Sequence, residues 1–119
     1  DEGAHITSLK RLERLRLLRD PYLSHAVSPH DMTRPEAREK AMQQIRRVVE
    51  IRRSIKDPEH RRVFHEIIAR FDESLSMRLY VHFTLFNETI SAQGTDEQYA
   101  RWRDDIEEMR VIGCFAMTE

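Results

Sequence analysis

Residues 72–93 constrain the fold of this 119-residue chain more than any other part of the sequence. Large apolar side chains recur there three or four positions apart, which is the spacing of one face of an α-helix. These side chains are Leu75, Leu79, Phe83, Phe86 and Ile90. Tyr80, Val81 and Leu85 extend the apolar surface beyond that face. Because a helix that is apolar nearly all round is central to a domain or lines a pocket, we predict a central helix here.

Three further points in the sequence carry start signals for helices. "TRPE" at residues 33–36 and "TDEQ" at residues 95–98 fit the capping box, in which the first and fourth residues bond to each other's backbone. Asp57 precedes Pro58, a pairing that suits an N-cap followed by the first helical residue. These signals predict helices that begin after residues 33, 57 and 95. Their predicted core positions are Ala37, Ala41, Ile45, Val48 or Val49, Ile55, Val63, Phe64, Ile67, Ile68, Phe71, Tyr99, Trp102 and Ile106.

A leucine series predicts the first helix, which follows Ser8 as a possible cap and ends before Pro21. The series is Leu9, Leu12, Leu15, Leu17 and Leu18, and we expect it to face the core. Basic residues alternate with these leucines in the run "KRLERLRLLR" at residues 10–19. Such a run could bind phosphates or an acidic partner, but its spacing is more typical of a solvated helix face.

The hydrophobic pattern changes after Glu108. "MRVIGCFAMTE" at residues 109–119 is a short apolar run with β-branched and aromatic residues, which favours a buried strand over another helix. A lone strand leaves its backbone groups unpaired, so it would pair with another chain or belong to a longer protein. The predicted fold class is all-α, with about five helices in residues 1–109 and the first strand of a β domain in residues 110–119.

The composition excludes several kinds of site. The net charge is −1, so the chain as a whole lacks the basic footprint of a nucleic-acid-binding protein. No apolar run reaches the roughly 20 residues of a membrane span. A single cysteine rules out an internal disulfide, and the six histidines lack ligand spacing, so we predict no metal site. His82 is expected to be a satisfied, partly buried histidine, with a pocket residue as the alternative.

The last third of the chain carries a specific set of motifs. They are V-x-x-x-L-F at residues 81–86, G-T-x-x-Q at residues 94–98 and "IGCFAMTE" at residues 112–119. Together they resemble the flavin-dependent acyl-CoA oxidases, within the wider acyl-CoA dehydrogenase superfamily. The "MTRPEAREKAMQQIRRV" stretch at residues 32–48 also resembles a helix start in this family. "FAMTE" alone would suit some dehydrogenases as well.

This resemblance implies an N-terminal helical domain, a middle β domain and C-terminal helical domains in a longer protein. The implied reaction is 2,3-dehydrogenation of a fatty acyl-CoA to a trans-2-enoyl-CoA, with FAD as hydride acceptor and O2 reduced to H2O2. The implied partners are fatty acyl-CoA, O2, the rest of the same polypeptide and a second copy in a homodimer. In the family the general base lies in the C-terminal domain, so we expect no catalytic residue here and no activity from this chain alone.

The resemblance also implies site residues. Thr118 matches a threonine that touches the flavin, and Met117 and Phe115 flank it. The acyl chain runs beside the apolar helix in this family, so the candidates for its tunnel are Phe83, Phe86, Asn87 and Ile90. The alternative role of these four is plain helix packing. We do not expect the chain alone to hold FAD.

Two other functions remain open at this point. One is an electron-transfer-linked acyl-CoA dehydrogenase. The other is a helical interaction module whose tail strand adds to a partner's sheet. The family is peroxisomal in eukaryotes and cytoplasmic in bacteria, so we expect a peroxisomal protein, with the cytoplasm as the alternative.

Overall fold

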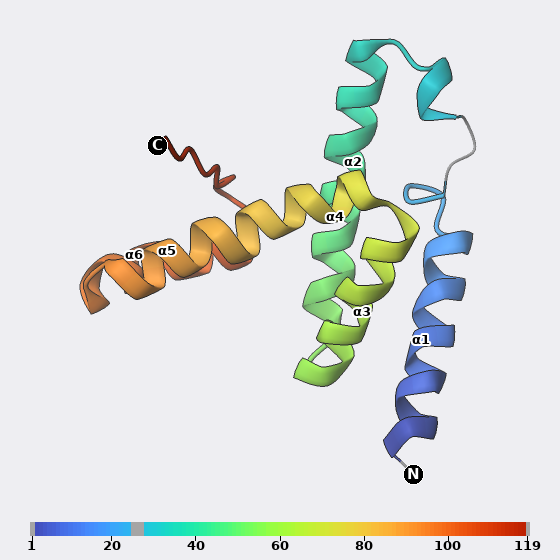
Figure 1. Cartoon of the computed structure of the whole chain (residues 1–119), viewed down its shortest axis with the longest axis horizontal. Helices are drawn as coiled ribbons and strands as arrows, with labels where there is room; N and C mark the ends of the chain where they lie inside the picture. Colours follow the sequence, from blue (N-terminus) through green and yellow to red (C-terminus); the bar gives the residue numbers. More distant parts are fainter. Residues whose placement is uncertain (1, 25–27, 119) are drawn as a thin grey trace. The chain divides into compact units, whose positions relative to one another are not determined.

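The computed structural model describes residues 2–24 and 28–118, and it divides the chain into two compact units (Figure 1). The first unit, Asp1–Leu75, holds α1 (Glu2–Arg19), the short 3₁₀ helix η1 (Pro29–Asp31), α2 (Arg34–Ser54) and α3 (Pro58–Phe71). The second unit, Ser76–Glu119, holds most of α4 (Glu73–Tyr80), the π-helical stretch η2 (Val81–Phe86), α5 (Asn87–Gln93) and α6 (Asp96–Glu107).

The predicted all-α class is confirmed for the described part of the chain. α4, η2 and α5 follow one another without a break, so they form the one long helix that the apolar spacing predicts. With α1, α2, α3 and α6, this gives five main helices among the described residues. None of the described helices combines the length and the apolar character required to cross a bilayer.

The helix starts predicted after residues 33, 57 and 95 are formed by the expected hydrogen bonds, whereas the start predicted after Ser8 is wrong because Ser8 lies inside α1. The Glu36 carboxylate accepts from the Thr33 backbone N–H at 2.8 Å. The Gln98 backbone N–H donates to the Thr95 hydroxyl at 3.2 Å, and the Gln98 side-chain oxygen accepts from the Thr95 N–H at 2.9 Å. Asp57 accepts from a backbone N–H three residues later at 2.8 Å. Each start therefore satisfies donors that a helix leaves unpaired at its N-terminus.

The first unit has a core made mainly by α2 and α3, with α1 packed along α3. The apolar spacing predicts most of it correctly, because the buried residues recur on one face of each helix. Those fully buried or nearly so are Leu17, Leu23, Ile45, Val48, Val49, Ile51, Ile55, Val63, Phe64, Ile67 and Ile68.

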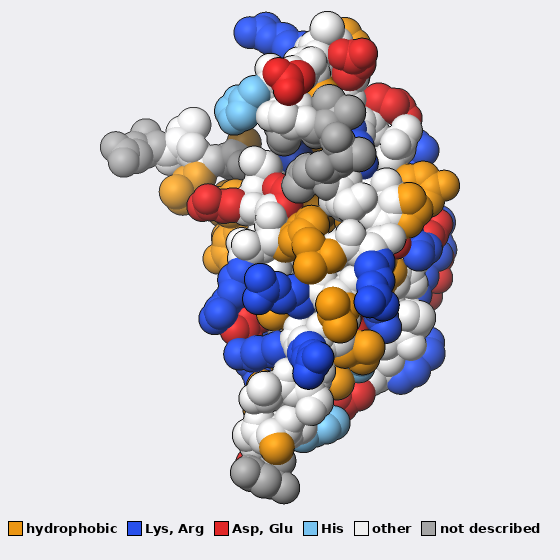
Figure 2. Space-filling view, turned by 90° about the vertical axis from the view of Figure 1, so that its right-hand side faces the viewer, with side chains coloured by type: hydrophobic (Ala, Val, Ile, Leu, Met, Phe, Trp, Pro, Cys, Tyr) orange, Lys and Arg blue, Asp and Glu red, His pale blue; other side chains and the backbone are white. Residues whose placement is uncertain are grey.

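The predicted core face of α1 is wrong. Leu12, Leu15 and Leu18 are 49%, 39% and 53% exposed, whereas Leu17 and the acidic Glu13 are buried. Figure 2 views the side of the molecule that carries α1, and hydrophobic side chains lie there among Lys and Arg at the surface. The leucine spacing fails because charged side chains, not leucines, fix which face of α1 turns inward.

Two buried carboxylates do this. Glu13 Oε1 lies 2.6 Å from Nε2 of His60 on α3, and Glu13 Oε2 lies 3.4 Å from Arg16. Asp20, just after α1, accepts from Nε of Arg47 on α2 at 2.6 Å. A buried carboxylate without partners would be strongly unfavourable, so these contacts hold α1 against α2 and α3 in one rotation.

Asp20 also closes the turn that follows α1. Its Oδ1 accepts from the backbone N–H groups of Tyr22 at 2.9 Å and Leu23 at 3.2 Å. Burial raises the pKa of Asp20, but the hydrogen bonds from Arg47, Tyr22 and Leu23 outweigh burial and hold the pKa below its usual value. The charged form of Asp20 therefore stabilises the first unit.

The predicted strand is not formed. Residues 111–118 lie outside any helix or strand, although residues 109 and 110 still bond to α6. A strand requires a neighbouring strand to bond with, and the described residues contain none. Side-chain contacts, not strand pairing, hold the start of this segment.

We predict that Asp20→Asn lowers the free energy of unfolding at pH 7 by about 1–3 kcal/mol, the usual range for a hydrogen bond to a charged group. Asparagine keeps an acceptor for the turn but loses the charge that pairs with Arg47. Because folding lowers this pKa, the contribution is complete above the unfolded value of about 3.9 and disappears as the pH falls through the folded value. Urea unfolding followed by circular dichroism measures it.

The matched control is Asp31→Asn, which removes an exposed carboxylate from η1. The control should unfold with the wild type at pH 7, whereas the deficit of Asp20→Asn should shrink as the pH falls below the unfolded value of about 3.9. Equal stability of Asp20→Asn and wild type at pH 7 would contradict the role given to Asp20.

Candidate functional site

The candidate site lies in the second unit, where the central helix changes from α to π geometry. The backbone N–H of Asn87 donates to the carbonyl of His82, five residues earlier. Such π-helical turns are rare and occur frequently at functional sites. The fully buried residue of this turn is His82, whereas Phe83 and Phe86 are half-buried.

His82 uses both ring nitrogens. The backbone N–H of Gly113 donates to Nδ1 at 2.9 Å, and Nε2 lies 2.8 Å from the carbonyl oxygen of Ile106. A backbone N–H can only donate and a carbonyl can only accept, so the ring is neutral with its proton on Nε2. The prediction of a satisfied histidine is confirmed, and the ring is fully rather than partly buried. His82 joins three segments: η2, the end of α6 and the tail after α6.

Aromatic rings and a glycine complete this cluster. The His82 ring meets Phe83 edge-on, with centroids 4.6 Å apart, and stacks on Phe86 with centroids 5.9 Å apart. Gly113 is buried against Phe86, and a Cβ at position 113 would lie 2.0 Å from Cδ1 of that ring. Only glycine allows the tail backbone to approach Phe86 this closely. We call His82, Phe83, Phe86, Ile106 and Gly113 the tail anchor.

The tail beyond the tail anchor carries the three residues that the resemblance assigns to the flavin. Phe115 is 43% exposed and Met117 is 79% exposed. Thr118 is exposed as well. The structure thus holds the start of "GCFAMTE" against η2 and presents the three side chains to solvent.

The four predicted tunnel residues have different surroundings in the described part of the chain. Phe83 and Phe86 pack on His82 in the tail anchor, and Asn87 lies at the end of the π turn. Ile90 lines a separate hollow of about 280 Å³ between α5 and α6. The other residues that line the hollow are Thr89, Gln93, Gly94, Gln98 and Trp102.

Sequence reasoning missed two members of this site. The apolar run predicts a strand at Gly113, although a glycine inside such a run signals a close backbone approach. The helical spacing predicts Trp102 in the core, whereas it is 38% exposed on the edge of the hollow; of its neighbours, Ile106 is buried and Tyr99 is half-buried. No pattern in the sequence marks the π turn.

Comparison with known families identifies the chain. The family described as "Acyl-coenzyme A oxidase N-terminal" matches residues 1–112, which is nearly the whole chain. The chain belongs to the acyl-CoA oxidase N-terminal family. The resemblance seen in the last third of the sequence is confirmed, and the match extends it to the first helix.

Individual relatives agree with this assignment. An acyl-coenzyme A oxidase of Komagataella pastoris is 33% identical over 123 aligned residues, covering 100% of this chain and 17% of the relative. Acyl-coenzyme A oxidase 4 of Candida tropicalis is 31% identical over 94% of this chain and 17% of its own length. Acyl-coenzyme A oxidase 3, peroxisomal, of Arabidopsis thaliana is 37% identical over 45% of this chain and 8% of its own length.

These alignments also define the size of the match. The chain spans at most 17% of the length of these three relatives. No solved structure gives a significant match to the chain. The family thus identifies this chain as an N-terminal helical domain.

The residues present fit one edge of a flavin site and no more. A flavin ring needs apolar walls on both faces and polar partners at its edge. Phe115, Met117 and Thr118 supply such groups, but all three are exposed and enclose no volume by themselves. Among the described residues they form no closed site, so a flavin held by them would need further walls from elsewhere.

We predict that Gly113→Ala destabilises the second unit by about 1–3 kcal/mol, the usual cost of overpacking, because the new methyl group overlaps the Phe86 ring. The penalty should shrink when Phe86→Ala is already present and should not vanish, since the Phe86 Cβ would still lie 2.6 Å away. Urea unfolding monitored by the fluorescence of Trp102, the single tryptophan, reports on this unit.

Gly3→Ala in α1 is the control, and it should be neutral or slightly stabilising because alanine favours an exposed helix. If the destabilisations caused by Gly113→Ala and Phe86→Ala were additive, the two positions would not be in contact. That result would contradict the tail anchor.

Proposed function

We propose that this chain supplies the N-terminal helical domain of a FAD-dependent acyl-CoA oxidase. The full protein would convert a fatty acyl-CoA to the trans-2-enoyl-CoA, with FAD accepting the hydride and O2 reduced to H2O2. The single observation that carries the proposal is the family match over residues 1–112. The anchored "GCFAMTE" tail supports it, because the motif that resembles the flavin segment starts from a fixed position.

The groups that this chain carries determine which parts of the proposed enzyme it supplies. Residues 1–109 form the helical domain in this proposal, and residues 110–119 lead into a β domain. Thr118 would bind the flavin through its hydroxyl or backbone, with Met117 and Phe115 beside it. The general base would be a carboxylate from another part of the polypeptide, so this chain alone would be inactive.

The tail anchor refines the roles of the predicted tunnel residues. Phe86 touches both His82 and Gly113, so we propose that it positions the tail rather than lining the tunnel alone. Ile90 faces a hollow with an apolar wall and is the better candidate for contact with an acyl chain. Phe83 and Asn87 would line the wall between the two.

The proposal extends to assembly and place in the cell. We propose a homodimer, as the resemblance implies, with fatty acyl-CoA and O2 as substrates of the whole protein. The Arabidopsis thaliana relative is named as peroxisomal, which supports a peroxisomal location for a eukaryotic protein of this family. A bacterial source would place the protein in the cytoplasm.

The direct test is peroxide production by the full-length protein that contains this chain. With palmitoyl-CoA as substrate and O2 as the only electron acceptor, we expect stoichiometric H2O2 and enoyl-CoA. Turnover that requires an artificial electron acceptor and yields no peroxide would instead identify a dehydrogenase. A protein with no turnover under either condition would be a binding module.

We predict a specific role for the tail. Thr118→Val in the full-length protein should raise the Kd for FAD about tenfold, the usual effect of losing a hydrogen bond to a charged or strongly polar group. The control is Thr7→Val in α1, whose hydroxyl bonds only its own helix at 2.8 Å. Unchanged flavin affinity in Thr118→Val would show that the Thr118 hydroxyl does not bind the cofactor.

A further inference from the structure

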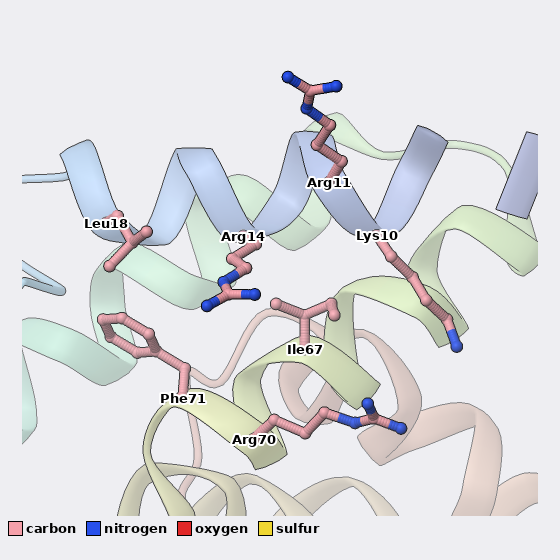
Figure 3. Close-up of a pocket in the computed structure, with 7 residues that line it drawn as sticks. All are labelled: Lys10, Arg11, Arg14, Leu18, Ile67, Arg70 and Phe71. Atoms are coloured by element: carbon pink, nitrogen blue, oxygen red, sulfur yellow. The ribbon is translucent and has the colours of Figure 1, made fainter. Parts of the chain in front are cut away.

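α1 and α3 of the first unit border a groove of about 590 Å³ (Figure 3). Its lining residues fall into two chemical kinds, apolar and cationic. The apolar ones are Leu18, Ile67 and Phe71, and the cationic ones are Lys10, Arg11, Arg14 and Arg70. Figure 3 shows the Arg14 guanidinium extending from α1 toward Ile67 and Phe71, whereas Arg11 points away from them.

The groove carries uncompensated positive charge. Lys10 and Arg70 share the carboxylate of Glu66, each at 2.9 Å. Arg14 has no hydrogen bond or ion pair within the part of the chain that the structure describes, and the same holds for Arg11. Lys10 and Arg70 are therefore paired with one carboxylate, whereas the Arg14 head group lies next to apolar side chains without an anion among the described residues.

The apolar side of the groove is recessed. Ile67 is 8% exposed and Phe71 is half-buried, while Leu18 is 53% exposed at the edge. An arginine beside apolar side chains is well suited to a carboxylate, because its planar fork binds two oxygens and its stem covers apolar surface. A ligand that satisfies both sides must have an anionic head and an apolar body.

We propose that this groove binds a single-chain anionic amphiphile, namely a long-chain fatty carboxylate. Its head group pairs with Arg14, and Lys10 and Arg70 add to the positive field. Its hydrocarbon chain lies along Leu18, Ile67 and Phe71. The site belongs to the first unit and is separate from the tail anchor, so it does not depend on the proposed oxidase activity.

The size and shape of the groove favour this occupant over larger ones. Its volume lies within the roughly 300–1,000 Å³ of small-molecule sites. A protein partner would need about 800 Å² of surface on this side, far more than seven residues offer. A flat bilayer would meet the exposed leucines of α1 but would not reach the recessed Ile67, whereas a single chain can.

The test is isothermal titration of the chain with sodium oleate below its micelle concentration. We expect one site per chain, with Arg14→Gln weakening binding by about tenfold or more, as for loss of a charged hydrogen bond. Leu18→Ser should also weaken it, because Leu18 borders the groove and is exposed enough to be replaced without unfolding. Circular dichroism confirms that each variant is folded.

Two matched controls distinguish binding in the groove from nonspecific electrostatic and nonspecific hydrophobic binding. Arg46→Gln removes an exposed arginine of α2 that does not line the groove, and it should bind oleate like wild type. Dodecyl maltoside, which has a chain but no charge, should bind at least about tenfold more weakly than oleate.

Three outcomes would overturn the proposal. The first is equal oleate affinity of Arg14→Gln and Arg46→Gln. The second is binding to phosphatidylserine vesicles without binding to monomeric oleate, which would indicate a membrane surface. The third is oleate binding by the 119-residue chain that is lost in the longer protein, which would show that another segment covers the groove.

Discussion

The arrangement of the candidate site depends on one neutral histidine. His82 is fully buried, and its two ring nitrogens bond to the Gly113 N–H and to the Ile106 carbonyl, which also accepts from the Met109 N–H at 3.1 Å. A buried imidazole is tolerated only when its donor and its acceptor are both satisfied, so the end of α6 and the start of the tail are fixed by the same ring. Gly113 makes this possible, because a side chain there would collide with Phe86.

In both units, buried polar groups fix how one segment lies against the others. In the first unit, the hydrogen bond between Glu13 and His60 and the ion pair of Asp20 with Arg47 choose the face of α1 that turns inward and leave its leucines exposed. In the second unit, hydrogen bonds of His82 choose the path of the tail. Removing one partner from such a group costs more than the interaction itself contributes, because the other partner stays buried and unsatisfied. Specific geometry, rather than additional apolar area, is what these groups supply.

The sequence predicts the parts of this molecule that rest on local rules. Capping boxes at Thr33 and Thr95 place helix starts correctly, because cap and partner are three residues apart and need no knowledge of the fold. The sequence does not predict the inward face of α1, because the partners of Glu13 lie on another helix. The role of Gly113 was missed for the same reason, since Phe86 is far away in sequence. The family motif, not the residue chemistry, points to the flavin, and the roles of the tail residues stay a prediction.

The central claim is that His82 holds the tail as a neutral ring protonated on Nε2. Nitrogen NMR of the chain with labelled histidine tests this most directly, because the two ring nitrogens give separate signals and a hydrogen-bond coupling can link Nδ1 to the Gly113 amide. The account predicts the Nε2–H tautomer at pH 7, with that coupling present and the Gly113 amide protected from exchange. A ring protonated on Nδ1, or a Gly113 amide that exchanges like an unfolded chain, would contradict it.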